Sequence, residues 1–193
     1  MRYYLLEYSE DSKDKLPKGK IPILVNDYNL NGFDLRLFWR GIYVEKWPDD
    51  LEFYYEKGNT ILDFVPNVLS WLMFTDKAVE VFKKSEIMNM QYFPIIIKKV
   101  GKKEHSHSLN VINVLDSVEA LDWEKSDYVS WEDDPKYIKF IRKVVLNKNA
   151  SKSNLDIFRL QESKNYIIVS ERIRKAIENE GLTGFGFKLL QTD

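Results

Sequence analysis

The segment at residues 166–190, YIIVSERIRKAIENEGLTGFGFKLL, constrains the fold more than any other stretch of this chain. A β-branched run ends at Ser170, and Ile173 and Ile177 then recur at helical spacing, so the pattern predicts a strand followed by a helix that Ser170 caps. Gly181 stands where a left-handed residue ends a helix. The later glycines alternate with phenylalanines, as in a strand that another segment approaches closely. A strand, a capped helix and a second strand are therefore expected in this order.

Three glycines so close together also raise the question of phosphate binding. A phosphate-binding loop precedes a helix, because the free N–H groups and the positive end of the helix then meet the anion. Here Gly181, Gly184 and Gly186 follow the helix. We therefore interpret them as a helix cap and as close-packing positions.

The rest of the chain consists mainly of short segments rich in β-branched and aromatic residues, separated by turn residues. A helix is expected at 74–86, with Thr75 as its N-cap. Pro94 is expected to put its end of a strand at a sheet edge. Two hairpins are expected, at 91–116 and 156–170. Strands or extended segments are expected at 2–9, 21–25, 35–47, 50–58, 91–100, 108–116, 137–147, 156–161, 165–170 and 183–190.

This pattern predicts an α+β fold with mixed, mostly antiparallel sheets and about two main helices. The length of 193 residues suits a single domain, 1–193, and two packed lobes, about 1–88 and 89–193, are the alternative. The chain has no cysteine, which excludes disulfides, thiolate zinc sites and a cysteine nucleophile. Its apolar runs are too short for a signal peptide or a membrane span. We expect a cytoplasmic protein with no membrane contact and no cofactor.

The two histidines are the main candidates for enzymatic chemistry. His105 and His107 flank Ser106 in a predicted turn, and two imidazoles at this spacing can share a metal ion or serve a hydrolytic site. A polar turn that contains both histidines is the simpler interpretation, and no metal is expected. An enzyme with a hydrolase-like site near His105 and His107 remains an alternative.

Charge is segregated along the chain although the net charge is only −1. Residues 116–134, the acidic block, carry eight acidic residues against one lysine and were expected to form a loop with a short helix. Residues 136–152, the basic stretch, carry six basic residues and no acidic one. Lysines interleaved with Tyr137 and Phe140 can bind nucleic acid, but a lysine-rich solvent face of an edge strand is the preferred interpretation. A nucleic-acid-binding module that uses 136–152 is thus an alternative only.

The acidic block is the predicted docking surface for a basic partner. Exposed tryptophans beside charged residues are typical anchors of protein interfaces. Trp123 is expected to turn back onto the core, and Trp131 is expected to be the exposed anchor. The candidate partner-binding residues are Asp122, Glu124, Trp131, Glu132, Asp133 and Asp134.

Four segments together resemble a known bacterial family. They are WPDDLEFYYEKG (47–58), NVLDSVEALDWEKSDY (113–128), DIFRL (156–160) and YIIVSERIRKAIENEGLTGFGF (166–187). The chain is similar in them to a family once filed as a domain of unknown function and now classed among immunity proteins of polymorphic toxin systems. The resemblance implies a cytoplasmic protein that is not an enzyme and that binds and occludes a cognate toxin. It implies no catalytic residue.

Overall fold

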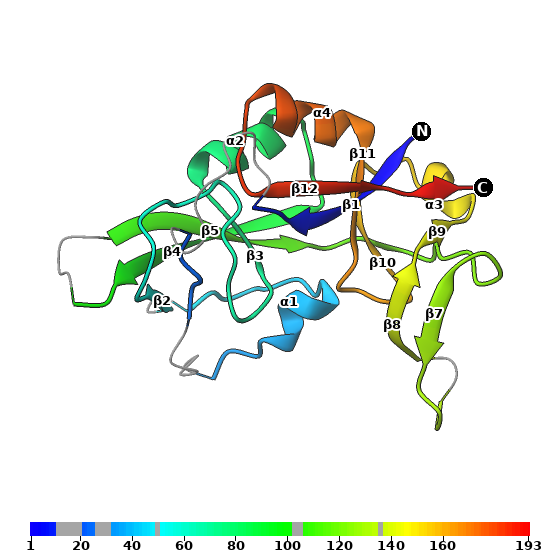
Figure 1. The fold of residues 1–193 in the computed structure, drawn as a ribbon, viewed down its shortest axis with the longest axis horizontal. Helices are drawn as coiled ribbons and strands as arrows, with labels where there is room; N and C mark the ends of the chain where they lie inside the picture. The colour runs from blue at the N-terminus through cyan, green and yellow to red at the C-terminus, as the bar shows by residue number, and fades with distance from the viewer. Residues whose placement is uncertain (11–20, 26–31, 49–50, 102–105, 135–136) are drawn as a thin grey trace.

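The computed structural model describes residues 1–10, 21–25, 32–48, 51–101, 106–134 and 137–193. Within these ranges the chain has the expected α+β fold, with two nine-residue helices and sheets of mixed and antiparallel strands (Figure 1). No helix of the described ranges is long and apolar enough to cross a membrane.

The larger sheet has five strands in the order β12-β1-β11-β10-β6. Their bounds are β12 (Phe185–Leu189), β1 (Tyr3–Tyr8), β11 (Ile167–Ser170), β10 (Ile157–Leu160) and β6 (Ser117–Val118). All neighbours pair antiparallel except β10 and β6, which are parallel. The first strand of the chain thus lies beside the last long one, and the predicted hairpin at 156–170 is confirmed.

The second sheet has four strands in the order β2-β4-β5-β3. Their bounds are β2 (Glu52–Tyr55), β4 (Met90–Lys99), β5 (Ser106–Val114) and β3 (Leu72–Phe74). β4 and β5 form the predicted hairpin, while β2 joins β4 in parallel. Because β2 pairs only with Ile96 to Lys99, the end of β4 that holds Pro94 has β5 as its one neighbour among the described strands, as expected.

Two small sheets complete the described strands. β7 (Asp127–Ser130) and β8 (Ile138–Lys143) form an antiparallel hairpin, which projects from the body of the molecule in Figure 1. β9 (Val145–Leu146) pairs in parallel with β13 (Gln191–Thr192).

The two long helices, α2 (Asp76–Lys84) and α4 (Glu171–Asn179), lie on the same side of the molecule (Figure 1). Thr75 and Ser170 cap them as predicted, since each side-chain oxygen accepts a hydrogen bond from the backbone N–H three residues on. Their apolar faces share a core with strands of both larger sheets. A second core lies around β2, β4 and β5, and a third behind β10 and β11.

Two sequence expectations were wrong. Residues 35–47 were expected to be extended, but they contain the short helix α1 (Arg36–Arg40), which ends at Gly41 with a φ of 62°. The turn puts Phe38 into an aromatic cluster, where its ring stacks on that of Trp71 at 4.7 Å between centroids. The acidic block was expected to hold a short helix, but it forms turns together with β6 and β7. The remaining helix, α3 (Asn149–Lys152), was not expected.

The division into two lobes at residue 88 stays a prediction. Strand pairing crosses that position in both larger sheets: β1 pairs with β11 and β12, and β2 and β3 pair with β4 and β5.

Candidate functional site

The GLTGF segment follows the end of α4 and packs closely against the chain around Phe64. Gly181 has a φ of 61° just after α4, as a helix-ending glycine should. Gly184 lies against the backbone of Phe64. A Cβ added at Gly184 would lie 2.4 Å from the carbonyl oxygen of Phe64. Between them, Thr183 donates its N–H and its hydroxyl to the carboxylate of Asp63, both at 2.9 Å. The predicted cap and close packing are confirmed.

Asp63 extends this tie to the start of α2. Its carboxylate also accepts a hydrogen bond from the hydroxyl of Thr75, at 2.7 Å, and Thr75 is the N-cap of that helix. One carboxylate therefore connects the C-terminal tail with a segment 120 residues earlier. The segment that carries the family resemblance most clearly thus forms hydrogen bonds and close contacts that stabilise the fold.

The candidate partner-binding residues lie at two ends of the β7–β8 hairpin. Asp122 and Glu124 stand in the turn that leads into it, whereas residues 131–134 form its described tip. The four residues of β7 lie between them, a length of roughly 13 Å. The structure thus brings residues 131–134 together and keeps them apart from the other two.

Asp122 holds its own turn. Its Oδ1 accepts hydrogen bonds from the N–H groups of Glu124, at 3.1 Å, and of Lys125, at 3.0 Å. The backbone N–H of Lys125 lowers the pKa of the Asp122 carboxyl, assisted by the ammonium group of the same lysine. That ammonium group also pairs with Asp193, next to β13. Asp122 therefore holds the turn, and Lys125 links the turn to Asp193 at the C-terminal end.

The hairpin tip is exposed and is rich in aromatic and acidic side chains. Trp131 is 53% exposed, as expected, and Tyr137 is 66% exposed. The backbone N–H of Trp131 donates to the carbonyl of Tyr137 at 3.0 Å, which closes the tip. Residues 132–134, all acidic, are exposed as well. The tip thus combines large apolar contact area with negative charge.

Trp123 differs from the expectation that it turns back onto the core. It is 40% exposed, and its ring meets the edge of Tyr128, with 5.2 Å between centroids. The turn that contains it is fixed by Asp122, so the tryptophan stays at the surface.

The basic stretch does not form a surface of one sign. In β8, Arg142 pairs with Asp127 at 3.1 Å, and its guanidinium lies 5.3 Å from the ring centroid of Phe140. The ammonium group of Lys139 lies 5.0 Å from the ring centroid of Trp131. Lys143 is the last residue of β8, Lys148 and Lys152 belong to α3 and its approach, and Lys136 lies outside the described residues. Acidic side chains of β7 and the tip lie beside the basic side chains of β8, so the described surface of the hairpin carries both signs of charge.

Of the two histidines, His107 alone lies within the described residues. His107 is an exposed residue of β5, opposite Ile97 of β4, while His105 lies outside the described residues. Within the described ranges there is no group of three His, Cys, Asp or Glu side chains that could hold a metal ion.

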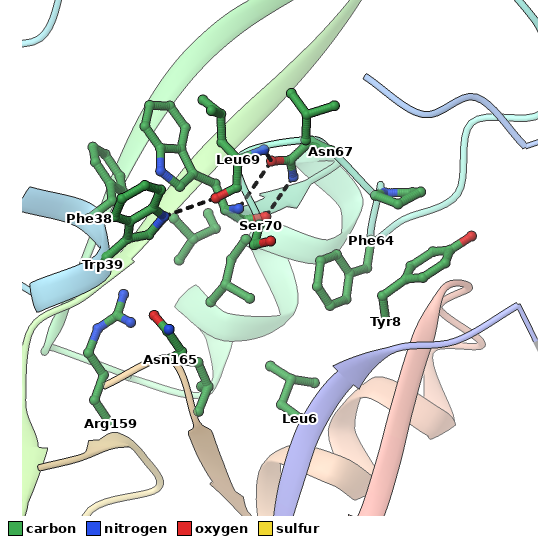
Figure 2. Close-up of a pocket in the computed structure, with 16 residues that line it drawn as sticks. Leu6, Tyr8, Phe38, Trp39, Phe64, Asn67, Leu69, Ser70, Arg159 and Asn165 are labelled. Atoms are coloured by element: carbon green, nitrogen blue, oxygen red, sulfur yellow. Dashed lines mark hydrogen bonds between the residues drawn. The ribbon is translucent and has the colours of Figure 1, made fainter. Parts of the chain in front are cut away.

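A cavity of about 570 Å³ lies between the two larger sheets, and the sequence reasoning missed it. Figure 2 shows Arg159 and Asn165 on one side of it and Leu6, Phe64 and Tyr8 on the other. The signal in the sequence was Arg159 itself, a charge inside the apolar strand segment DIFRL. All four residues of β10 are buried, so this arginine had to enter the interior.

No curated protein matches the chain in a sequence comparison. A model of an immunity protein family, Imm11, matches residues 6–192. The matched range contains both long helices, nearly all of both larger sheets and the β7–β8 hairpin. The resemblance noted from the sequence is thereby confirmed, and the chain belongs to the Imm11 immunity protein family.

Proposed function

We propose that this protein acts in the cytoplasm as a non-enzymatic inhibitor that binds a cognate toxin and occludes its active site, and that the β7–β8 hairpin tip is its contact surface. Family membership supports the toxin-neutralising role. The observation that carries the choice of surface is the tip itself, where exposed Trp131 and Tyr137 flank three acidic residues.

The physical reasons concern affinity and speed. Large aromatic side chains at the centre of an interface supply most of its binding energy when they become buried. Acidic side chains around them accelerate the capture of a basic partner, and rapid capture is what an inhibitor of a lethal protein requires. The hairpin projects from the body, so that a partner can surround its tip (Figure 1).

The test requires the cognate toxin, which is to be sought as a toxin domain encoded in a gene next to that of this chain. The charge-reversal variant changes residues 132–134 to lysine, and we expect it to slow association and to weaken the dependence of the rate on salt. Trp131→Ala should mainly speed dissociation, with a loss of about 2 kcal/mol, or roughly 30-fold in Kd. Association and dissociation rates at two salt concentrations, and protection of cells that express the toxin, are the measurements.

Matched control variants separate the tip from general effects. Tyr43 is 63% exposed and lies outside the hairpin, so Tyr43→Ala controls for the removal of an exposed aromatic side chain in Trp131→Ala. Lysine substitutions at Glu45, Glu56 and Glu180, all exposed, change the net charge as much as the reversal at 132–134. If the tip variants fold, bind at the rates of the wild type and protect cells, the contact surface lies elsewhere.

A further inference from the structure

The cavity between the two larger sheets has the size and the walls of a small-molecule site. Its volume of about 570 Å³ falls within the range that such ligands occupy. β1 and β11 contribute to one wall, β3 and β5 to another, and α1 closes one side. The aromatic rings of Phe38, Trp39, Phe64 and Trp71 line it.

Arg159 brings a positive charge into this cavity. Its side chain is on the same face of β10 as Ile157, which packs in the core between the sheets, whereas Phe158 and Leu160 face the opposite core. The residue is only 5% exposed. Burial lowers the pKa of its guanidinium to about 10, so the group stays charged at neutral pH.

The guanidinium is held in place but is only partly satisfied. Its Nε donates to the carbonyl of Val114 and its Nη1 to the carbonyl of Lys164, each at 2.8 Å. A guanidinium has five N–H bonds, so three of them find no acceptor among the described residues. No carboxylate of the described ranges forms an ion pair with it, and a buried charge without a counter-ion is costly.

Gly41 shows that the surroundings are shaped to this arginine. A Cβ added to Gly41 would lie 2.9 Å from both Cδ and Nε of Arg159 and 2.7 Å from the carbonyl oxygen of Val114. The left-handed end of α1 therefore packs directly on the arginine side chain and fixes its direction. This leaves its free N–H bonds preorganised rather than mobile.

Two further groups of the described lining, the indole of Trp71 and the hydroxyl of Tyr8, also have no hydrogen-bond partner within the described part of the chain, and both can donate. Trp71 is 3% exposed, and its indole Nε1 has no hydrogen-bond partner within the described part of the chain. Opposite Arg159 the wall is apolar, with Leu6 and Phe64 facing it across the space in Figure 2. The described lining thus presents hydrogen-bond donors without acceptors and, opposite Arg159, an apolar surface. A ligand with an acceptor group and an apolar part would complement both.

We propose that this cavity binds a small monocarboxylate with an apolar body, its carboxylate on Arg159 and its aryl or alkyl part against Leu6 and Phe64. Arg159 is the only cationic residue among the described residues of the lining, so one negative charge suffices, and a phosphate dianion would stay partly uncompensated beside an apolar wall. An aspartate or glutamate side chain of a partner would fill only a small part of the volume. This site goes beyond toxin binding and does not depend on it.

The probe is 3-phenylpropionate, with 3-phenylpropionamide as its uncharged control. Titration of the wild-type protein, followed by calorimetry and by the fluorescence of the tryptophans that line the cavity, should show binding of the acid at least 10-fold tighter than of the amide. Arg159→Met should weaken binding of the acid at least 10-fold. Arg142→Met removes the same group from the exposed hairpin and should leave that binding unchanged.

Binding of acid and amide with equal affinity, or no binding of the acid, would overturn the proposal. If Arg159→Met does not fold, a crystal structure of the wild type soaked with the acid decides, because a carboxylate seated away from Arg159 contradicts the assignment. A third outcome would also overturn the proposal: the wild-type protein does not bind the acid, and a folded Arg159→Met variant loses affinity for the toxin. In that case the cavity belongs to the toxin interface and the small-molecule site is wrong.

Discussion

Alanine at two glycines of the GLTGF segment separates backbone strain from steric contact. Gly181 and Gly184 both have positive φ, 61° and 85°. A Cβ at Gly181 would meet nothing within 4 Å, whereas a Cβ at Gly184 would lie 2.4 Å from the carbonyl oxygen of Phe64 and 3.2 Å from the Cβ of Leu62. The two substitutions therefore share the conformational cost and differ in the clash.

The magnitudes follow from these contacts. A left-handed conformation costs alanine about 1 kcal/mol more than glycine, and this is the whole expected effect of Gly181→Ala. At Gly184 the clash is with backbone, so the segment around Phe64 must move. That movement strains two hydrogen bonds of 3.0 Å, from Phe64 N–H to the carbonyl of Thr183 and from Ser9 N–H to that of Gly184. Overpacking of this kind adds about 1–3 kcal/mol, for a total of about 3 kcal/mol.

Urea denaturation and thermal unfolding provide the measurement. For a chain of this length, 1 kcal/mol corresponds to a shift in Tm of about 2–4 °C, so Gly181→Ala should lower Tm by about 2–4 °C and Gly184→Ala by roughly 6–12 °C. Equal losses in the two variants, within about 0.5 kcal/mol, would refute the reasoning, because the contact with Phe64 would then yield at no cost.

Three further predictions test the ties of the fold and the histidine alternative. Asp63→Ala should lower the free energy of unfolding by about 2–3 kcal/mol, because two threonines lose a shared charged acceptor. Asp34→Ala removes an exposed ion pair and an exposed hydrogen bond from the N–H of Arg36, and it should cost clearly less; equal costs in urea denaturation would contradict this. Burial raises the pKa of the Asp156 carboxyl, but hydrogen bonds from Arg172 and Ser170 lower it by more, so the net pKa lies below the ordinary 3.8. A carboxyl whose pKa is lowered in the folded state stabilises the fold at a pH above its ordinary pKa, and this stabilisation is lost as the pH falls through the folded-state pKa. Asp156→Asn should therefore flatten the acid side of a curve of Tm against pH, and an unchanged curve would speak against this tie. His107→Ala should change stability by less than about 0.5 kcal/mol because the residue is exposed, and a larger loss in thermal unfolding would indicate an unrecognised contact.

The elements that the sequence predicted correctly are those with local signals. The side chain of Ser170 accepts a hydrogen bond from the N–H three residues on, and Gly181 ends the same helix because glycine adopts a positive φ without steric cost. The hairpin of β4 and β5 likewise follows from two β-rich segments separated by a short turn. Such signals act within a few residues, so they can be read without knowledge of the rest of the fold.

The elements that the sequence reasoning missed depend on distant partners. Aromatic and β-branched composition around Phe38 favours a strand, yet packing on Trp71, a residue far along the chain, makes a helical turn there the better arrangement. The acidic block reads as one patch, but the hairpin places its two halves at opposite ends.

The candidate sites divide in the same way. Exposure of Trp131 could be predicted, because the acidic residues beside it cannot be buried without partners. The cavity at Arg159 could not, because its walls come from both larger sheets and α1, and the acceptors that hold the guanidinium include Val114, 45 residues away. By itself the sequence determined the capped helices α2 and α4 and the hairpins β4–β5 and β10–β11, since their signals depend on neighbouring residues. Only the tertiary structure decided which charge entered the interior unpaired, since that depends on which backbone carbonyls and apolar walls long-range packing brings to it.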